Sequence, residues 1–379
     1  MRLVLPVFLI GLLSLVQLPA AGPVAGGLQP FVEKHELAGA VTLVADKDKV
    51  LSLEAIGFAD LAAAKPMGPD TMFWIASESK AMTAVAVMML VDEGKLSLDD
   101  PVEKYLPEFR GQMVVAEKDG AHVLLRKPAH PATLREVLSH TSGLPFKSAL
   151  EEPTLDALPL ATAVRSYAVT PLQSEPGVRY QYSNAGINTA ARVLEVVSRQ
   201  KYEDFMQQRL FTPLGMKDTT FWPSPEQVAR LAKTYRPTKD KMGLEEAPLG
   251  QLRLPLSDRE HRYPMPAGGL FSTARDTALF CQMLLNRGEL GGRRYLSEAA
   301  WKELTSRQTA PSIKESYGFG LTVGPDGFGH GGAHATNMEV RVKDGLVLIW
   351  MVQHAGFPGG GAKAQGVFRK WAVESFGQK

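Results

Sequence analysis

The 379-residue sequence contains a single cysteine, Cys281, so no disulfide can form within the chain. Cys281 lies in an apolar helical pattern with Leu279, Phe280, Met283 and Leu284. This setting favours a buried small hydrophobic residue over a catalytic thiol. With 45% hydrophobic and 22% charged residues, the chain can bury a large core without cross-links, and we expect one folded unit with two lobes.

An excess of charge of either sign is also missing. There are 42 basic and 40 acidic residues and no basic run, so a nucleic-acid partner has no electrostatic support. The zinc-protease pattern is absent, because His35-Glu36 has no second histidine three residues later. His330 and His334 are four apart, but two glycines intervene and strand-like sequence follows, which makes zinc-ligand geometry doubtful. We expect no metal and no other cofactor.

A Gly-x-Ser-x-Gly nucleophile elbow is missing as well, which argues against an α/β-hydrolase. His140 could still join another Ser-His-Asp triad, since triads are defined by geometry and not by order. Beside Thr141-Ser142-Gly143, however, we expect His140 to organise a loop.

The N-terminus is typical of a secretory signal peptide. Met1-Arg2 gives a basic start, residues 3–16 are an apolar core, and Pro19-Ala20-Ala21-Gly22 offers small residues for cleavage. We predict a signal peptide over 1–22, a mature domain over 23–379, and a periplasmic or secreted location. The alternative is an uncleaved anchor, but the apolar run is short for a bilayer span, and we expect no stable membrane span after cleavage.

Ser77-Glu78-Ser79-Lys80 opens a long apolar stretch. Residues three apart on a helix lie on one face, about 5–6 Å apart at Cβ, so a serine hydroxyl and a lysine amine can share a proton. Only Thr83 is polar in 81–91, which predicts a helix buried on all sides, with Gly94 as its C-terminal stop. A lysine at the mouth of such a helix is partly desolvated, which lowers its pKa and would activate Ser77 as a nucleophile.

The spacing alone is weakly specific, because Ser198-Arg199-Gln200-Lys201 repeats it. We expect that second match at the solvated end of a helix. In isolation, Ser77 would be an N-cap residue and Lys80 a surface charge.

Tyr182-Ser183-Asn184 precedes a second helical pattern. A tyrosine on the loop before a helix can point into a cleft, and beside a cationic lysine it could relay protons between Ser77 and a leaving group. The amide of Asn184 is suited to hold a substrate carbonyl or the lysine. Ser-Asn-Ala-Gly is equally ordinary turn and capping chemistry.

His330-Gly331-Gly332 lies beside two strand-like runs, 338–342 and 346–353. Glycines beside a strand permit close approach of a ligand to the backbone. The main-chain N–H of Ala333, paired with that of Ser77, could form an oxyanion hole. The alternative is a glycine-rich hairpin with a merely polar histidine.

On these motifs the chain resembles the serine β-lactamase and penicillin-binding-protein superfamily, on its class C-related branch. Ser77-x-x-Lys80, Tyr182-x-Asn184 and His330-Gly331-Gly332 match its three motifs in order, and the stretches 138–144 and 267–273 are similar to others in this branch. The resemblance implies that Ser77 is acylated, that Lys80 and Tyr182 share general-base and general-acid duties, and that Asn184 binds substrate or the polar network.

The third motif departs from many β-lactamases, which carry Lys-Thr-Gly where this chain has His330-Gly331-Gly332. A lysine would be a permanent cation for a substrate carboxylate, whereas an unperturbed histidine is mostly neutral at pH 7. Carboxylate-bearing β-lactams should therefore bind less well. The resemblance associates histidine here with DD-peptidases and β-lactamase-like esterases.

The order of elements predicts an α/β (α+β) fold with an antiparallel sheet built from both ends of the chain. We expect a helix over 28–35, strands over 40–45 and 50–57, a hairpin over 113–125 turning at Asp119-Gly120, and a strand over 319–323. Two later strands precede a closing helix over 362–376. The sheet lobe would comprise about 23–100 and 267–379, with an all-helical lobe inserted over about 101–266.

Two hypotheses about function follow. The first is an exported serine hydrolase that opens an ester or amide bond, and possibly a β-lactam, through an acyl-serine intermediate. A DD-carboxypeptidase is an alternative within that class. The second is a binding protein for cell-wall peptides with little or no turnover, if the changed third motif has spoiled catalysis. The expected partner is thus a small-molecule ester, an amide or a cell-wall peptide.

Overall fold

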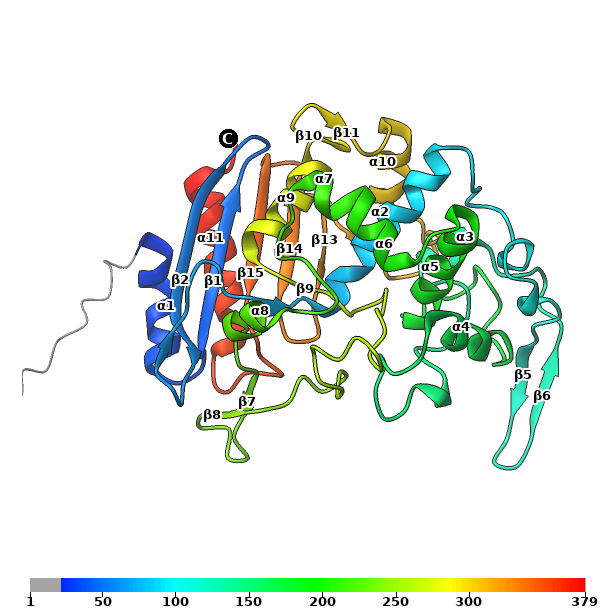
Figure 1. Cartoon of the computed structure of the whole chain (residues 1–379), viewed down its shortest axis with the longest axis horizontal. Helices are drawn as coiled ribbons and strands as arrows, with labels where there is room; N and C mark the ends of the chain where they lie inside the picture. The colour runs from blue at the N-terminus through cyan, green and yellow to red at the C-terminus, as the bar shows by residue number, and fades with distance from the viewer. Residues whose placement is uncertain (1–21, 379) are drawn as a thin grey trace, which may run out of the picture.

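The computed structural model describes residues 22–378, so the predicted signal peptide over 1–22 lies almost entirely outside the described residues. A seven-stranded antiparallel sheet forms the centre of one lobe, with the strand order β12-β13-β14-β15-β1-β2-β3 (Figure 1). Its strands are β1 (Gly39–Ala45), β2 (Val50–Asp60), β3 (Lys65–Pro66), β12 (Thr322–Val323), β13 (Phe328–Gly331), β14 (Asn337–Arg341) and β15 (Leu346–Met351). β1 pairs with β15, Val41 opposite Met351, so both ends of the chain build the sheet as predicted.

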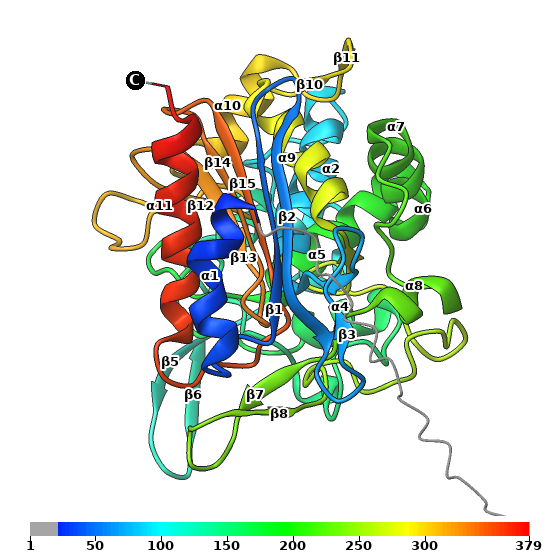
Figure 2. The same ribbon diagram turned by 90° about the vertical axis from the view of Figure 1, so that its left-hand side faces the viewer.

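Helices cover both faces of this sheet. Helices α1 (Pro23–Glu33) and α11 (Ala364–Phe376) lie side by side on one face (Figure 2). Helices α2 (Ser79–Asp92) and α9 (Ala274–Leu285) lie on the other, with α10 (Glu298–Thr305) beside α2. Every residue of β1 is buried, because adjacent residues point to opposite faces and each face is covered.

The inserted segment is mostly helical, and most of its helices lie on the far side of α2 from the sheet, whereas the helix over 225–230 lies against the sheet lobe (Figure 1). Its helices are α3 (Leu134–Leu138), α4 (Leu160–Ala168), α5 (Asn184–Ser198), α6 (Tyr202–Met206), α7 (Thr212–Leu214) and α8 (Pro225–Arg230). The segment also contains two hairpins, β5 (Val114–Lys118) with β6 (Val123–Arg126) and β7 (Tyr235–Pro237) with β8 (Leu244–Glu246). It is therefore not all-helical. The first hairpin turns at Asp119 as predicted, where the carboxylate accepts from the N–H groups of Ala121 and His122.

Part of the predicted helical segment packs on the sheet lobe. The N–H of Lys233 donates to Ala59 O, and that of Tyr235 donates to Gln353 O. Two further short pairings complete the sheets: β4 (Phe73–Trp74) with β9 (Phe271–Ser272), and β10 (Glu289–Leu290) with β11 (Arg293–Arg294). Single turns of 3-10 helix occur at Ala76–Glu78, Val102–Lys104, Pro107–Phe109, Ala149–Glu151 and Gly361–Lys363, and a π-helical turn at Gln207–Phe211.

Helix α2 is the element that positions the Ser-x-x-Lys motif. All its residues from Ser79 to Leu90 are buried, as its apolar sequence predicts. Gly94, at φ 68°, ends it in the left-handed conformation that glycine tolerates best, and its N–H donates to Val91 O. The only polar residue in the middle of the helix is Thr83, whose hydroxyl contacts Tyr202 at 2.7 Å and donates to Pro266 O.

Two element boundaries differ from the sequence prediction. The first helix begins five residues earlier than predicted, at Pro23, which is favourable at the first helical position. The predicted strand over 319–323 is reduced to Thr322–Val323, because Gly320 adopts φ 64° and turns the chain. Within residues 22–378, no helix combines the length and apolar character needed to cross a bilayer.

Candidate active site

Ser77 lies in the 3-10 turn between β4 and α2 and is the only partly exposed residue from Thr71 to Leu90. The preceding Ala76 is buried with φ 45°, a conformation that is costly for a residue with a Cβ and is found at functional sites. The turn is held by the 267–273 stretch. The N–H of Ile75 donates to Leu270 O at 3.1 Å, and the N–H of Leu270 donates to Ser79 Oγ at 3.3 Å.

The amine of Lys80 lies 3.0 Å from Ser77 Oγ and donates to Ala267 O at 2.6 Å. The side chain is fully buried, and among residues 22–378 no carboxylate forms a salt bridge with it. A buried, unpaired ammonium is strongly disfavoured, and desolvation holds the pKa of Lys80 well below its usual value. The amine therefore favours the neutral form, whose lone pair is free to take the serine proton.

Tyr182 lies on the loop before α5 and faces the same hydroxyl. Burial raises its pKa to about 12, and interaction with the Ser77 side chain opposes part of that shift. Lys80 Nζ lies 4.7 Å from the centre of the Tyr182 ring. The lowered pKa of Lys80 agrees with the predicted desolvation, so Tyr182 lies beside an amine that favours its neutral form and not beside the cationic lysine that the proton relay assumed. Tyr182 keeps its proton at neutral pH.

Hydrogen bonds from the 138–146 segment fix the Tyr182 loop. The N–H of Gln181 donates to His140 O at 2.7 Å, and Ser183 Oγ donates to Pro145 O at 2.6 Å. The same Ser183 oxygen accepts from the Gly186 N–H at 2.9 Å and so caps α5. His140 therefore organises this loop, as the sequence predicted.

Asn184 is the first residue of α5 and is buried, and its N–H donates to Phe146 O at 3.0 Å. Its side-chain oxygen has no hydrogen-bond partner among the described residues. A buried amide oxygen is normally satisfied, so Asn184 has an unused acceptor.

The third motif lies beside the Ser77 turn. His330 and Gly331 are in β13, opposite Met338 and Asn337 of β14. A Cβ on Gly332 would lie 2.7 Å from Ile75 O, so only glycine lets this strand end approach the turn so closely. The N–H of Gly332 donates to Thr336 O at 2.8 Å, whereas that of the exposed Ala333 has no acceptor within residues 22–378.

His330 is neutral, as expected, but it does not present a free nitrogen to a ligand. Nδ1 contacts Gly331 O at 2.7 Å and Nε2 contacts the Tyr317 hydroxyl at 3.0 Å. Burial is the main cause that lowers its pKa to about 3. Both ring nitrogens are used inside the protein, so the third wall of the site, which His330, Gly331 and Gly332 form, supplies no cation for a substrate carboxylate.

Three residues that the motifs did not single out complete the site: Ala267, whose carbonyl accepts from Lys80, and Tyr317 and His140, which lie behind the third wall. The 138–144 and 267–273 stretches were the available signals for two of them. Tyr317 had no comparable signal.

Other candidates lie elsewhere. Cys281 is buried in α9 without a disulfide partner. His334 lies edge-on to Trp74, with ring centres 4.9 Å apart, and contacts Gln353 at 3.0 Å. Within residues 22–378, no group of three or more metal-binding side chains is assembled.

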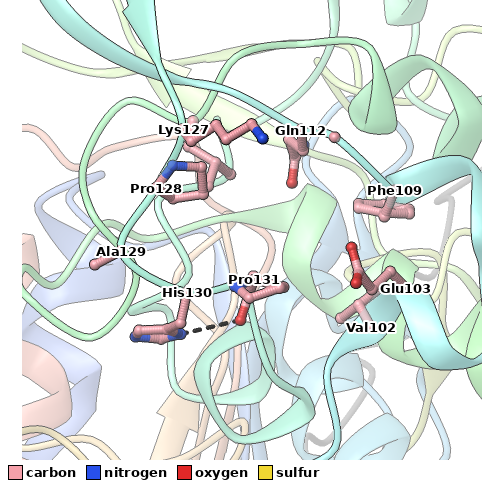
Figure 3. Close-up of a pocket in the computed structure, with 12 residues that line it drawn as sticks. Val102, Glu103, Phe109, Gln112, Lys127, Pro128, Ala129, His130 and Pro131 are labelled. Carbon is pink, nitrogen blue, oxygen red and sulfur yellow. Dashed lines mark hydrogen bonds between the residues drawn. The ribbon is translucent and has the colours of Figure 1, made fainter.

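A cavity of about 260 Å³ in the helical lobe is separate from these motif residues (Figure 3). Apolar side chains of Val102 and Phe109 line it together with Glu103, Gln112 and Lys127, and the His130 ring nitrogen contacts Pro131 O at its edge. None of the residues predicted to act in chemistry lines this cavity.

The sheet lobe, the inserted helical lobe and a buried helix that begins at Ser-x-x-Lys define a protein with the β-lactamase/transpeptidase fold. The chain belongs to the β-lactamase family, whose model matches residues 25–367.

Named relatives agree with this assignment. Protein Rv1367c of Mycobacterium tuberculosis is 33% identical over 359 residues, covering 84% of this chain and 86% of the relative. Esterase EstB of Burkholderia gladioli is 33% identical over 211 residues, covering 52% and 51%. Penicillin-binding protein 4 of Amycolatopsis lactamdurans is 30% identical over 302 residues, covering 79% and 72%.

A solved structure shows the same fold. EstCE1, described as a hydrolase with promiscuous acyltransferase activity, superposes with a TM-score of 0.75 at 24% identity, covering 92% of this chain and 97% of that one. The predicted fold class is thereby confirmed, and the family match over residues 25–367 confirms the predicted superfamily.

Proposed function

We propose that this protein is a serine hydrolase that cleaves an ester or amide bond through an acyl-Ser77 intermediate. The observation that carries the proposal is the 3.0 Å separation of Lys80 Nζ and Ser77 Oγ, with the lysine fully buried and unpaired. A neutral amine at this distance is a general base, and the partly exposed serine hydroxyl is the only group of its turn that a substrate can reach.

In the acylation step, Lys80 Nζ takes the proton of Ser77 as Oγ bonds to the substrate carbonyl carbon. The N–H groups of Ser77 and Ala333 are the proposed donors to the resulting oxyanion, and losing one such donor typically costs about 10²–10³ in rate. Tyr182, protonated because its pKa is about 12, gives its proton to the leaving oxygen or nitrogen as that bond breaks. The ammonium of Lys80 then returns a proton to the phenolate.

Deacylation reverses these roles. Water gives a proton to the Tyr182–Lys80 pair as its oxygen attacks the acyl carbon, and the carboxylic acid product leaves as Ser77 Oγ regains a proton from Lys80. Asn184 is the proposed ligand of the substrate or of the polar network around Lys80, as the resemblance implies; its amide oxygen is buried and has no hydrogen-bond partner among the described residues.

We rank uncharged esters first among substrates. His330 has no free N–H and a lowered pKa, so nothing in the third motif attracts a carboxylate. The relative named Esterase EstB supports this order, while the relative named penicillin-binding protein 4 supports a DD-carboxypeptidase as the second candidate. Comparing hydrolysis of short p-nitrophenyl esters, nitrocefin and a D-Ala-D-Ala peptide would separate the esterase, β-lactamase and peptidase activities.

Covalent labelling tests the mechanism directly. A fluorophosphonate probe should label the wild-type protein and Ser198→Ala, but not Ser77→Ala. Ser198 is the matched control, since it begins the other Ser-x-x-Lys match. Labelling of Ser77→Ala would remove Ser77 from the mechanism, and a stoichiometric adduct without turnover on any substrate would favour the cell-wall peptide-binding alternative.

We also propose export, on the basic start, apolar core and small residues of 1–22. N-terminal sequencing of the protein from the periplasm or medium of an expressing bacterium should begin near residue 23. An intact Met1 on protein retained in the membrane fraction would support the uncleaved anchor.

A further inference from the structure

A chain of hydrogen bonds runs behind the proposed active site, from the Tyr182 loop to the third wall. The N–H of Ser183 donates to His140 Nδ1 at 3.2 Å, and His140 Nε2 lies 3.2 Å from the Tyr317 hydroxyl. That hydroxyl lies 3.0 Å from His330 Nε2, and His330 Nδ1 lies 2.7 Å from Gly331 O. Every side chain in it is buried, with exposed fractions of 0% for His140, 3% for Tyr317 and 8% for His330.

The two ends of this chain fix its polarity. A backbone N–H only donates, so His140 Nδ1 is an acceptor, and its ring proton must be on Nε2, pointing at the Tyr317 oxygen. At the other end a carbonyl only accepts, so His330 carries its proton on Nδ1 and accepts from Tyr317 through Nε2. Both ends therefore require the Tyr317 hydroxyl to accept from His140 and donate to His330.

We propose that Tyr317 is a positioning residue, whose hydroxyl locks His140 and His330 as opposite neutral tautomers and thereby holds the Tyr182 loop and the third wall on either side of Ser77. The expected effect on catalysis rests on the proposed function. The tautomers of His140 and His330 do not, because they follow from the hydrogen bonds alone.

The surroundings disfavour any other arrangement. Adding a proton to either imidazole would break a bond of the chain, because each ring uses its second nitrogen as an acceptor. The ionisable groups facing the cluster are Lys80, Tyr182 and Tyr180, with Glu315 acting on Tyr180. Burial lowers the pKa of both histidines and raises that of Tyr317, so all three stay neutral across the physiological range.

The tautomers are measurable in the substrate-free wild-type protein. In ¹⁵N-histidine-labelled protein, long-range ¹H–¹⁵N correlations should show His140 protonated on Nε2 and His330 on Nδ1, with neither titrating between pH 5 and 8. The Tyr317→Phe variant should alter the signals of both rings. If either ring is the other tautomer or a cation in the wild type, the proposal is wrong, whatever the hydrolase assay gives.

Kinetics test the positioning role. Tyr317→Phe should lower kcat roughly ten- to a hundredfold with little change in KM, because a lost buried hydrogen-bond partner would loosen groups that act in the transition state. The matched control is Tyr180→Phe. Tyr180 packs against His140 and Tyr317 with ring centres 5.8 and 5.6 Å away, yet its hydroxyl makes no hydrogen bond within residues 22–378.

Unchanged kcat in a folded Tyr317→Phe protein would overturn the positioning role, as would an equal loss in Tyr180→Phe. If Tyr317→Phe does not fold, the tautomers of the wild-type protein decide the proposal. Failure of the proposed function appears separately, as labelling that survives Ser77→Ala while the two tautomers are as expected.

Discussion

The chain contains Ser-x-x-Lys twice, and the two matches differ in the burial of the lysine, in the contact between the serine and the lysine, and in their position on a helix. Lys80 is fully buried and lies 3.0 Å from Ser77 Oγ. Ser198 is the last residue of α5, and Arg199, at φ 58°, ends that helix, so the exposed Lys201 lies outside it. The Ser198 oxygen accepts from the N–H of Gln200 instead. The comparison teaches that the Ser-x-x-Lys spacing alone does not place the amine in a buried site beside the serine hydroxyl, which is the arrangement that a lysine base requires.

The largest effect is expected when the lysine of each Ser-x-x-Lys match is replaced and the two variants are compared. Lys80→Met keeps an apolar stem of similar size but removes the base, so kcat/KM on p-nitrophenyl butyrate should fall about 10²–10⁴-fold. Lys201→Met should leave it unchanged, because that exposed amine contacts no reacting group. Residual activity of Lys80→Met within tenfold of wild type would show that another group takes the serine proton.

A second prediction concerns Tyr182. Its phenol lies beside the first Ser-x-x-Lys match, at Ser77, and not beside the second, at Ser198. Tyr182→Phe should slow hydrolysis of an ethyl ester roughly a hundredfold, but that of a p-nitrophenyl ester much less, because a stable phenolate leaves without a proton. Initial rates on two esters of the same acid measure this difference. Equal losses on both esters would assign Tyr182 to the base and not to the acid.

Much of this arrangement could be predicted from sequence, because its signals are local. The buried helix followed from the apolar run after Lys80, the sheet from strand patterns at both ends, and the loop role of His140 from its turn-forming neighbours. The strand predicted over 319–323 was wrong in its first part. There the backbone of Gly320 approaches Lys80 so closely that a Cβ would lie 2.5 Å from the lysine carbonyl oxygen, a tertiary constraint that no local pattern contains.

Local sequence patterns also could not predict the contacts that Ala267 and Tyr317 make with the motif residues. Ala267 contacts Lys80 across 187 positions of the chain, and Tyr317 contacts His140 across 177. The pKa directions also follow from burial and not from residue type. The lowered pKa of Lys80 was predicted from the apolar sequence that follows it and is confirmed, whereas the raised pKa of Tyr182 follows from a burial that its local sequence does not indicate.

A third prediction compares neighbouring glycines of the third wall. Gly332→Ala should lower kcat about tenfold or more, because its Cβ would lie 2.7 Å from Ile75 O and push the strand end away from the Ser77 turn. Gly331→Ala should cost less, since its Cβ would lie 3.4 Å from Thr336 O, an ordinary contact. Steady-state kinetics and melting temperatures of both variants test this order, and a larger loss in Gly331→Ala would contradict it.

The smallest expected effect concerns the other buried ionisable neighbour of Ser77. Glu78 is fully buried, and neither of its carboxyl oxygens has a hydrogen-bond partner among the described residues. Burial raises its pKa from 4.5 to about 8, with nearby Thr336 opposing part of the shift. Between these values the folded protein keeps a proton that the unfolded chain has released, so stability falls as the pH rises through this window.

Glu78→Gln removes this pH-dependent loss, because the amide cannot ionise. The melting temperature of the variant, relative to wild type, should rise between pH 5 and pH 8 by roughly a few degrees, whatever its offset at pH 5. Glu108→Gln, at an exposed position, serves as the control and should show no such trend. If the melting-temperature difference between Glu78→Gln and wild type stays constant with pH, the pKa of Glu78 is not raised in the folded protein. The fold would then tolerate a carboxylate charge beside Ser77, at a position where the described residues offer it no hydrogen-bond partner.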